Sequence, residues 1–556
     1  MSFTQDFTAV AGSLGWTALV AIIPILYFFW ALAIKKMKGY IAGLSTLALS
    51  IIVAVIAFQV PVATALASAS QGALYGIIPI GWIIVTSVFL YNLTVKTGHF
   101  NIIRSSVLSI TEDRRIQALL IAFSFGAFLE GAAGFGAPVA ISAALLVGLG
   151  FNPLLAAGLC LIANTAPVAF GAIGVPITVM EGITGISALD ISKMVGRQLP
   201  FLAVFIPFML VMIMVGFKKT IEVLPAIIVS GVAFAVTQFL SSNYLGPELP
   251  DILSSLVSLF ALAIFMRFWK PKNIYRFKED KQEATANKEH YNAKEIFIAW
   301  SPFIVLTAFI SLWGIPTIKK ALVGSYEGEN VILSVVNKIG SALTFYPEVP
   351  YLHNKVIDGS TGNAIAAVYK FELLAAAGTA ILFAAIVSKF LLGIVWGAWV
   401  KTFFETLNEI KFPLLTICSV VGYAYVANTA GMMASIGLVL AKTGALFPFF
   451  SPVLGWLGVV ITGSDTSSNV LFAKLQQVTA TSVGMEPVLA LAANTGGGVT
   501  GKMISPQTLA VAAAAVGLAG RESELLKFAF KYSIILLIAI SILTYLQSTV
   551  LTWMIP

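Results

Sequence analysis

Three charged residues lie within apolar parts of the sequence, where charged side chains are rare. Glu130 is the only charged residue of segment 116–180, and it stands in the glycine-rich stretch LEGAAGFGAP (129–138). Asp465 and Lys502 lie in two further apolar stretches. A charge in hydrocarbon is unstable unless it is neutralised, paired or hydrated. These residue types therefore predict proton uptake and release by the acids, and a counter-ion or anion-binding role for the lysine.

Each of these roles has a structural alternative. We expect Glu130 and Asp465 to be the proton-coupling residues, but Glu130 as a permanently neutral or ion-paired structural acid is the competing interpretation. Lys502 either binds an anionic substrate or forms a purely structural pair with Asp465, since buried charges usually find partners. The three histidines fall in loops, which removes a buried histidine as proton carrier.

Small and polar residues gather at the same interruptions of the apolar runs. A helix broken inside a membrane leaves backbone N–H and C=O groups unpaired, which is tolerated where they line a polar cavity or hold a ligand. Half-helix N-termini suit a carboxylate, and Asn, Thr and Ser side chains add hydrogen bonds. The alternative is that these residues only pack helices together. The predicted substrate-binding residues are Gly131, Gly134, Gly136, Asn164, Thr165, Ser464, Thr466, Ser467, Ser468, Asn494, Thr495, Gly496 and Lys502.

The composition requires a membrane to position these residues. The chain has 556 residues, of which 58% are hydrophobic and only 10% charged, and its mean hydropathy is +0.94. Repeated apolar runs of about 20 residues predict transmembrane helices rather than the short alternating strands of a barrel. Lys and Arg, which give a net charge of +8, gather in loops expected to face the cytoplasm, so we exclude nucleic acid and expect lipid as the surrounding partner.

The positive-inside rule and the lengths of the apolar runs predict the topology. Segment 116–150 is too long for one span and too short for two, and Pro138 and several glycines lie in its middle, so we expect a re-entrant hairpin from the inner side. A broken helix over 154–178 follows. In the second half we expect a hairpin from the outer side over 446–476 and a broken helix over 487–516.

The predicted fold is an all-α polytopic membrane protein with about 12 transmembrane helices plus two re-entrant hairpins in an inverted repeat. Residues 1–266 form the N-terminal membrane repeat, 267–295 a cytoplasmic basic loop, and 296–556 the C-terminal membrane repeat. NTAPVAFGAIGVP (164–176) and NTGGGVTGKMISP (494–506) share Asn, Thr, Gly and Pro in register. Chance is the alternative explanation for so short a match among small residues.

Catalytic and cofactor motifs do not fit this chain. GGGVTGKM (496–503) has the spacing of a phosphate-binding loop, but Met503 stands where the magnesium-binding Ser or Thr is needed. Facing aspartates of an intramembrane protease and the zinc motif H-E-x-x-H are both missing from the sequence. We therefore expect no enzyme activity, no cofactor and no metal site.

Several longer motifs carry a resemblance across nearly the whole chain. FGAFLEGAAGFGAPVAI, NTAPVAFGAIGVPI, VGRQLPF, LGPELPDI, GWLGVVITGSDTSSNVLF and GKMISPQ resemble the bacterial L-lactate permease family. The resemblance implies uptake of L-lactate, with D-lactate and glycolate as related substrates, by proton symport across the bacterial inner membrane. With about twelve spans and two hairpins, we expect a symporter of the elevator or rocking type.

The paired hairpins more distantly resemble the ion transporter superfamily. Its sodium-coupled dicarboxylate members carry Ser-Asn-Thr tips, whereas the tips here contain EGAAGFG and GSDTSSN. This departure favours an acid, Glu130 or Asp465, over bound sodium as the coupling group. A homodimer is possible because related folds often dimerise. An ion channel or ion exchanger that uses the buried acids without an organic substrate is the alternative function.

Overall fold

The computed structural model describes residues 2–132, 134, 137–277, 291–519 and 521–556. Regular structure in these residues is almost entirely helical. Four strands of two residues form two small ladders, in which β1 (Phe3–Thr4) pairs with β3 (Val356–Ile357) and β2 (Thr344–Phe345) pairs with β4 (Phe371–Glu372). The first ladder ties the N-terminus to the polar segment that precedes α20 (Ala377–Leu391), and the second lies within that segment.

Ten helices of the described residues are long and apolar enough to cross a membrane, and there are up to twelve spans if each of two bent pairs counts as one. An α-helix satisfies its own backbone hydrogen bonds, which is why apolar segments take this form in lipid. The bent pairs are 153–163 with 168–184, at 63°, and 188–195 with 199–215, at 42°. The predicted all-α polytopic membrane protein is confirmed.

The first 96 residues contain three spans. They are built from α1 (Leu14–Ala21), α2 (Ile23–Phe29), η1 (Trp30–Ile34), α3 (Gly39–Ile56), α4 (Val62–Tyr75), η2 (Gly76–Gly81) and α5 (Trp82–Lys96), and the short α6 (His99–Leu108) follows. The third span is longer than the apolar run suggests and bends within η2, where Pro79 interrupts the helix.

The segment with the predicted inner hairpin forms two helical arms. The first arm is α7 (Arg114–Ala118), η3 (Leu119–Phe125) and α8 (Gly126–Ala132), and the second is α9 (Ala137–Gly148). The second arm packs back along η3 and α8, which is the arrangement that a hairpin requires. Every residue of the first arm after Arg114 is buried, whereas other spans expose an apolar face. How deeply the hairpin enters the membrane stays a prediction.

A broken helix follows the hairpin, as predicted for 154–178. Its parts are α10 (Pro153–Ala163), the short η4 (Val168–Phe170) and α11 (Gly171–Thr184). Ala172, Ile173 and Gly174 have left-handed backbone angles at the start of α11. The remaining helices of the first half are α12 (Ala188–Val195), α13 (Leu199–Val215), α14 (Phe217–Ile221), α15 (Leu224–Tyr244) and α16 (Pro250–Phe268).

The second half begins after the basic loop, most of which lies outside the described residues. Its helices are α17 (Ala293–Gly314), α18 (Pro316–Leu322), α19 (Val331–Ala342), α20, α21 (Trp396–Ala430), α22 (Met432–Leu440), η5 (Ala441–Leu446), α23 (Phe447–Thr462), α24 (Asp465–Val483), α25 (Pro487–Lys502), α26 (Pro506–Ala515), α27 (Glu522–Thr549) and η6 (Thr552–Met554). The predicted outer hairpin corresponds to α23 and α24, which pack side by side around Gly463 and Ser464.

One detail of the predicted repeat is wrong. Asn494 and Thr495 do not lie at a helix break, because α25 continues through them to Lys502 and the chain leaves the helix only before α26. In the first copy, by contrast, α10 ends at Ala163 and the break begins at Asn164. The matching Asn-Thr pairs therefore occupy different structural positions, even though each precedes an interruption.

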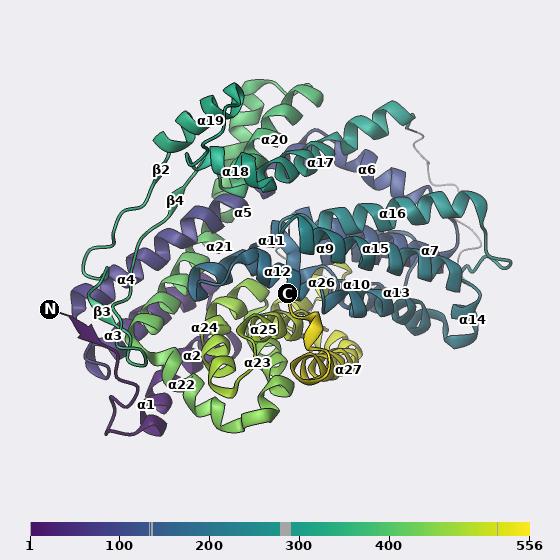
Figure 1. The fold of residues 1–556 in the computed structure, drawn as a ribbon. Helices are drawn as coiled ribbons and strands as arrows, with labels where there is room; N and C mark the ends of the chain where they lie inside the picture. The colour runs from purple at the N-terminus through teal and green to yellow at the C-terminus, as the bar shows by residue number, and fades with distance from the viewer. Residues whose placement is uncertain (1, 133, 135–136, 278–290, 520) are drawn as a thin grey trace.

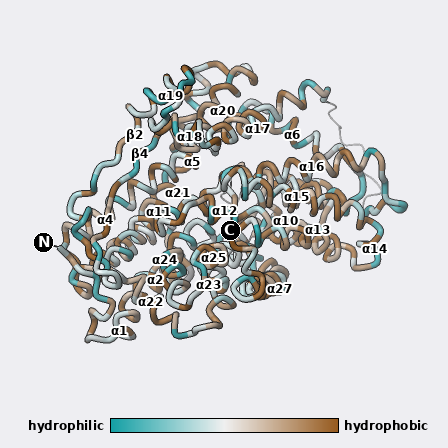
Figure 2. The backbone as a smooth tube through the Cα atoms, in the orientation of Figure 1, coloured by the Kyte–Doolittle hydropathy of each residue, from teal (hydrophilic) through white to brown (hydrophobic). Residues whose placement is uncertain are grey.

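Helices from the two halves of the sequence pack together (Figure 1). α21 lies along α3 and α4, α20 lies against α5 and α17, and α23, α24, α25 and α27 form another group. α11 packs on α24, and α8 packs on α16. Figure 2 shows apolar residues along helices such as α13 and α27, with polar residues around β2 and β4. α11 thus contacts both predicted hairpin regions, through α8 in the first and α24 in the second.

Candidate functional site

Two of the predicted charged residues form a direct ion pair. Nζ of Lys502, at the end of α25, lies 2.7 Å from Oε1 of Glu130 in α8. Asn164, at the end of α10, donates from Nδ2 to the other carboxylate oxygen at 2.9 Å. Exposed fractions are 3% for Glu130 and 8% for Lys502. A carboxylate, an ammonium group and an amide from three separate helices therefore meet in the protein interior.

The break between α10 and α11 leaves room for Glu130. A Cβ atom on Gly171 would lie 2.8 Å from Oε1 of Glu130, closer than a carbon atom can approach without displacement. Gly134, with a φ of +60°, packs beside Ala172 in the same break. These glycines let the tip of the first hairpin and the broken helix approach closely, so that the carboxylate reaches Lys502.

The structure gives Lys502 a different partner from the predicted one. Asp465, in the first turn of α24, accepts a hydrogen bond from Nδ2 of Asn469 at 3.4 Å, and its Oδ1 has no hydrogen-bond partner within the described residues. Lys502 pairs with Glu130 instead of Asp465. The suggested Asp465–Lys502 pair is thus wrong for this conformation, because α8 reaches the end of α25 and satisfies the ammonium group.

A third buried acid, Asp251, was missed at the sequence level. It is the second residue of α16 and is 1% exposed, and neither of its carboxylate oxygens has a partner in the part of the chain that the structure describes. A Cβ on Gly131, the neighbour of Glu130, would lie 2.8 Å from the Cβ of Asp251. The sequence signal was an acid in the first turn of an apolar helix, in LPDILSSL, but such an acid resembles a loop boundary.

Three carboxyl groups therefore share one ammonium group. Asp251 and Asp465 each interact electrostatically with both Glu130 and Lys502. We call these four residues the charged cluster. With all three acids ionised, the cluster would carry two uncompensated negative charges in the protein interior, which is strongly unfavourable. The cluster must therefore hold protons or counter-charge from a bound ion.

Unpaired polar atoms gather around the charged cluster. Oδ1 of Asn164 and Oγ1 of Thr165 are buried without hydrogen-bond partners among the described residues, as are the carboxylate oxygens of Asp251 and Asp465 noted above. Buried polar atoms are normally hydrogen-bonded, so several unpaired acceptors in one place indicate a site that binds something polar. Two of these atoms belong to residues predicted to bind substrate.

Other predicted residues form hydrogen bonds within the protein. Asn494 donates to Oδ1 of Asn469 at 2.8 Å and accepts from Gln476 at 3.0 Å, and Thr495 donates to the same Asn469 oxygen at 3.1 Å. Asn469 also donates to the carbonyl of Pro176 in α11 at 2.9 Å. Asn469 and Gln476, which sequence analysis missed, thus connect α24 with α25, while Asn469 also reaches the broken helix.

The tip of the second hairpin has mainly local roles. Oγ of Ser464 caps α24 by accepting from the N–H of Ser467 at 3.2 Å, and Ser468 donates to the carbonyl of Gly455 at 3.1 Å. Gly496 packs near Ile540 and Gln198. Thr466 and Ser467 are partly exposed. Gly136 lies outside the described residues. These residues remain candidates whose role in binding is untested.

A large cavity lies between α11 and α24, and none of the four residues of the charged cluster lines it. Its volume is about 1270 Å³, and its walls include Thr178 and Glu181 of α11 together with Lys474 and Gln477 of α24. The same two helices lead to the cluster, since α11 begins at Gly171 and α24 begins at Asp465. Glu130 and Lys502 do not line the cavity. The cluster is therefore closed from this cavity in the conformation described.

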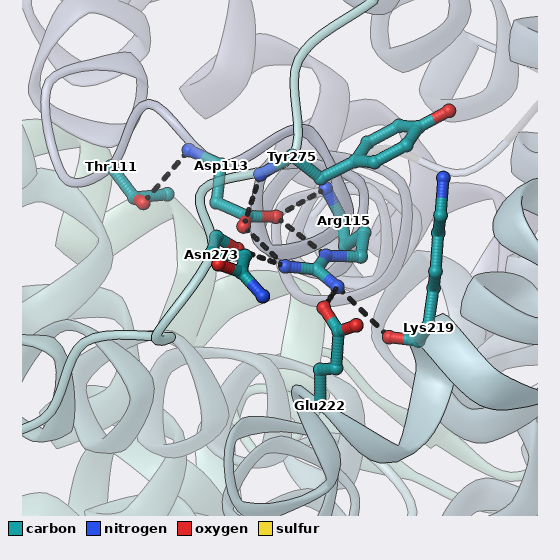
Figure 3. A network of polar contacts seen from close by, with 7 residues as sticks. All are labelled: Thr111, Asp113, Arg115, Lys219, Glu222, Asn273 and Tyr275. Atoms are coloured by element: carbon teal, nitrogen blue, oxygen red, sulfur yellow. Dashed lines mark hydrogen bonds and ion pairs between the residues drawn. The ribbon is translucent and has the colours of Figure 1, made fainter.

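A second buried charge network lies at the start of the first hairpin arm (Figure 3). Arg115 donates to both oxygens of Asp113, at 3.1 and 2.8 Å, and to Oε2 of Glu222 at 2.8 Å. It also donates to the carbonyls of Lys219, at 2.9 Å, and Asn273, at 2.7 Å. This network ties α7 to the segments that follow α14 and α16. It contains no predicted site residue, and within the described chain no group of acids, histidines and cysteines could hold a metal ion.

Comparisons with known proteins agree with the sequence resemblance. The chain matches the family model described as L-lactate permease over residues 17–551. It is 63% identical to the L-lactate permease of Bacillus subtilis (strain 168), with 100% of both chains covered. It is 51% identical to the glycolate permease GlcA of Escherichia coli (strain K12), covering 100% of this chain and 99% of that one, and 50% identical to the L-lactate permease of the same organism, covering 100% of both.

One solved structure, of the Alcanivorax borkumensis YdaH transporter, has a TM-score of 0.32 at 14% identity and covers 81% of this chain and 88% of that chain. That similarity is too low to support an argument. The family match and the apolar helices confirm the expected multi-pass location in the bacterial plasma membrane and a transport function rather than an enzymatic one. The chain belongs to the L-lactate permease family.

Proposed function

We propose that this transporter takes up L-lactate, with D-lactate and glycolate as related substrates, by proton symport. The observation that carries the proposal is the 2.7 Å ion pair between Glu130 and Lys502 in the protein interior. Lys502 is the only ammonium group within the charged cluster, and an anionic substrate needs a positive pole. The substrate carboxylate and Glu130 therefore compete for the same partner.

This competition couples the anion to a proton. Leaving one member of a buried ion pair without its partner costs about 3–5 kcal/mol. When lactate binds Lys502, Glu130 avoids that penalty by taking up a proton. When the proton leaves, Glu130 returns to Lys502 and displaces lactate. Asp465, with one carboxylate oxygen unpaired, is a second candidate for carrying the proton.

The same competition for Lys502 explains why transport of lactate alone, or of a proton alone, would be slow. The Glu130–Lys502 pair is neutral when the site is empty, and lactate plus one proton restores neutrality when it is full. Either species alone leaves a net charge in the apolar interior, which opposes the movement of helices across the membrane. Symport follows if only the neutral states change conformation.

Unpaired acceptors beside the ion pair suit a 2-hydroxy acid. Oδ1 of Asn164 and Oγ1 of Thr165 are available to accept a hydrogen bond from the substrate hydroxyl. Lactate and glycolate share a carboxylate and the adjacent hydroxyl and differ by one methyl group. Relatives named L-lactate permease and glycolate permease, at 63% and 51% identity, support this substrate class.

Uptake of labelled L-lactate into proteoliposomes tests the proposal. We expect accumulation against a concentration gradient when the lumen is alkaline, and loss of accumulation when a protonophore collapses the pH gradient. Unlabelled glycolate and D-lactate should compete. Propionate, which lacks only the hydroxyl of lactate, is the matched control and should compete about tenfold less well. Ion flux without lactate uptake would instead favour the ion channel or exchanger.

A further inference from the structure

Asp251 is the least satisfied ionisable group of the charged cluster. Its side chain is buried at the start of α16, and both carboxylate oxygens are without hydrogen-bond partners among the described residues. The first N–H groups of a helix often hold such a carboxylate, but those of α16 do not bond to it. Asp251 is therefore neither a helix cap nor a member of an ion pair.

The surroundings of Asp251 contain one acid and one base. Glu130 of α8 and Lys502 of α25 are the charged groups that interact with it within the described chain. α15 and η3, which also pack on α16, bring Ser230 and Ser124, whose hydroxyls bond to Ser258. α11, the remaining helix against α16, has its acid Glu181 on the wall of the large cavity. No described cation is free to neutralise Asp251, because Lys502 already pairs with Glu130.

Burying an unpaired neutral carboxyl group costs far less free energy than burying an unpaired carboxylate. The packing around Asp251 therefore favours its protonated form over an unpaired carboxylate. Close packing of Gly131 against Asp251 keeps this proton beside Glu130, since Gly131 directly follows that residue. Any larger residue at position 131 would separate α8 from α16.

We propose that Asp251 is the residue through which the coupling proton reaches Glu130. The inference rests on the proposed symport. When lactate binds Lys502, the Glu130 side chain is released from its ion pair and moves within hydrogen-bond distance of Asp251; the O–H bond of Asp251 then breaks and an O–H bond forms on Glu130, so that one proton moves and Asp251 becomes a carboxylate. A proton from the side that supplied lactate then restores Asp251. One lactate anion and one proton have entered, and the cluster is neutral again.

Asp251→Asn tests this relay in the full-length protein reconstituted in proteoliposomes. The amide cannot release or accept the proton, so we expect accumulation of labelled lactate driven by a pH gradient to fall at least about tenfold. The rate at which labelled lactate exchanges for unlabelled lactate at equal pH should stay within about threefold of the rate of the unchanged protein. Glu130 keeps its proton while one lactate replaces another, so this exchange does not need the relay. Asp251→Glu, which retains an acid, should recover most of the accumulation.

Asp190→Asn is the matched control, since the side chain of Asp190 is half-exposed and pairs with Lys193 at 3.0 Å, not with any residue of the charged cluster. It should leave both accumulation and exchange unchanged. Thermal unfolding of the purified variants establishes that each is folded, and Asp251→Ser replaces Asp251→Asn if the latter does not fold.

Two results would overturn the relay. Accumulation at the unchanged level in a folded Asp251→Asn or Asp251→Ser protein removes Asp251 from the proton path. Equal losses of accumulation and exchange, with no recovery in Asp251→Glu, assign it a purely structural role. Failure of the unchanged protein to accumulate lactate would instead contradict the proposed symport, so the two outcomes are distinguishable.

Discussion

Two buried charge networks in this protein differ in how completely their members are paired. Arg115 uses all five of its N–H groups, on two carboxylates and two carbonyls. In the charged cluster, three acids share one lysine, and both Asp251 and Asp465 keep unpaired oxygens. A fully paired network holds one arrangement, whereas an incompletely paired one can exchange protons or ligands. The comparison assigns a structural role to Arg115 and a transport role to the cluster.

The largest expected effect concerns the fully paired network. Arg115→Met leaves the buried Asp113 without its ion-pair partner, so we expect a loss of about 3–5 kcal/mol in stability. Thermal unfolding in detergent measures it. The matched control is Arg521→Met, which removes an exposed pair with Glu524 and should change the unfolding temperature little. If Arg115→Met folds with unchanged stability, the network is not structural.

Glu130→Gln should come next in size and should act on coupling rather than folding. Glutamine imitates the protonated acid but cannot lose the proton, so we expect accumulation driven by a pH gradient to fall by about 100-fold while lactate exchange persists. Paired assays of accumulation and exchange in proteoliposomes provide the measurement. Uphill uptake at the unchanged level in this variant would show that Glu130 does not couple lactate to the proton. The charged cluster would then lose its proposed functional difference from the Arg115 network.

Lys502→Met should weaken lactate binding. The variant loses a charge-assisted hydrogen bond to the substrate carboxylate, worth about 1.5–3 kcal/mol, or about 10- to 100-fold in affinity. Because Lys502 pairs with Glu130, the double variant Lys502→Met, Glu130→Gln removes both charges together and should fold better than Lys502→Met alone. Near-normal lactate affinity in the folded double variant, measured by competition in exchange, would leave Lys502 with a purely structural role.

The smallest expected effect belongs to Thr165. Its hydroxyl is buried without a described partner, so Thr165→Val removes an unsatisfied group and should leave stability unchanged or slightly higher. Lactate affinity should fall about threefold if the hydroxyl binds substrate, while propionate affinity should not change. Equal effects on both ligands would indicate that Thr165 contributes only to packing.

The helical fold and the membrane location were predictable because a lipid bilayer allows few backbone structures. Long apolar runs must become helices in hydrocarbon, and basic residues collect in the loops between them. The interruptions around Glu130 and Asp465 were also visible, since Gly and Pro in an apolar run disfavour a continuous helix. The position of the helix break in the second repeat could not be predicted, because α25 accommodates Gly496, Gly497 and Gly498 inside a tightly packed helix.

The amino-acid sequence by itself determined that Glu130, Asp465 and Lys502 are buried charges in a helical membrane transporter. Hydropathy is a local property, so a charged residue within an apolar run is identified without knowledge of the fold. Only the tertiary structure decided their partners. Lys502 meets Glu130 across 372 positions of sequence, and Asp251 joins them because α16 packs against Gly131. Ion pairing acts over a few ångströms, and the packing of distant helices sets those distances.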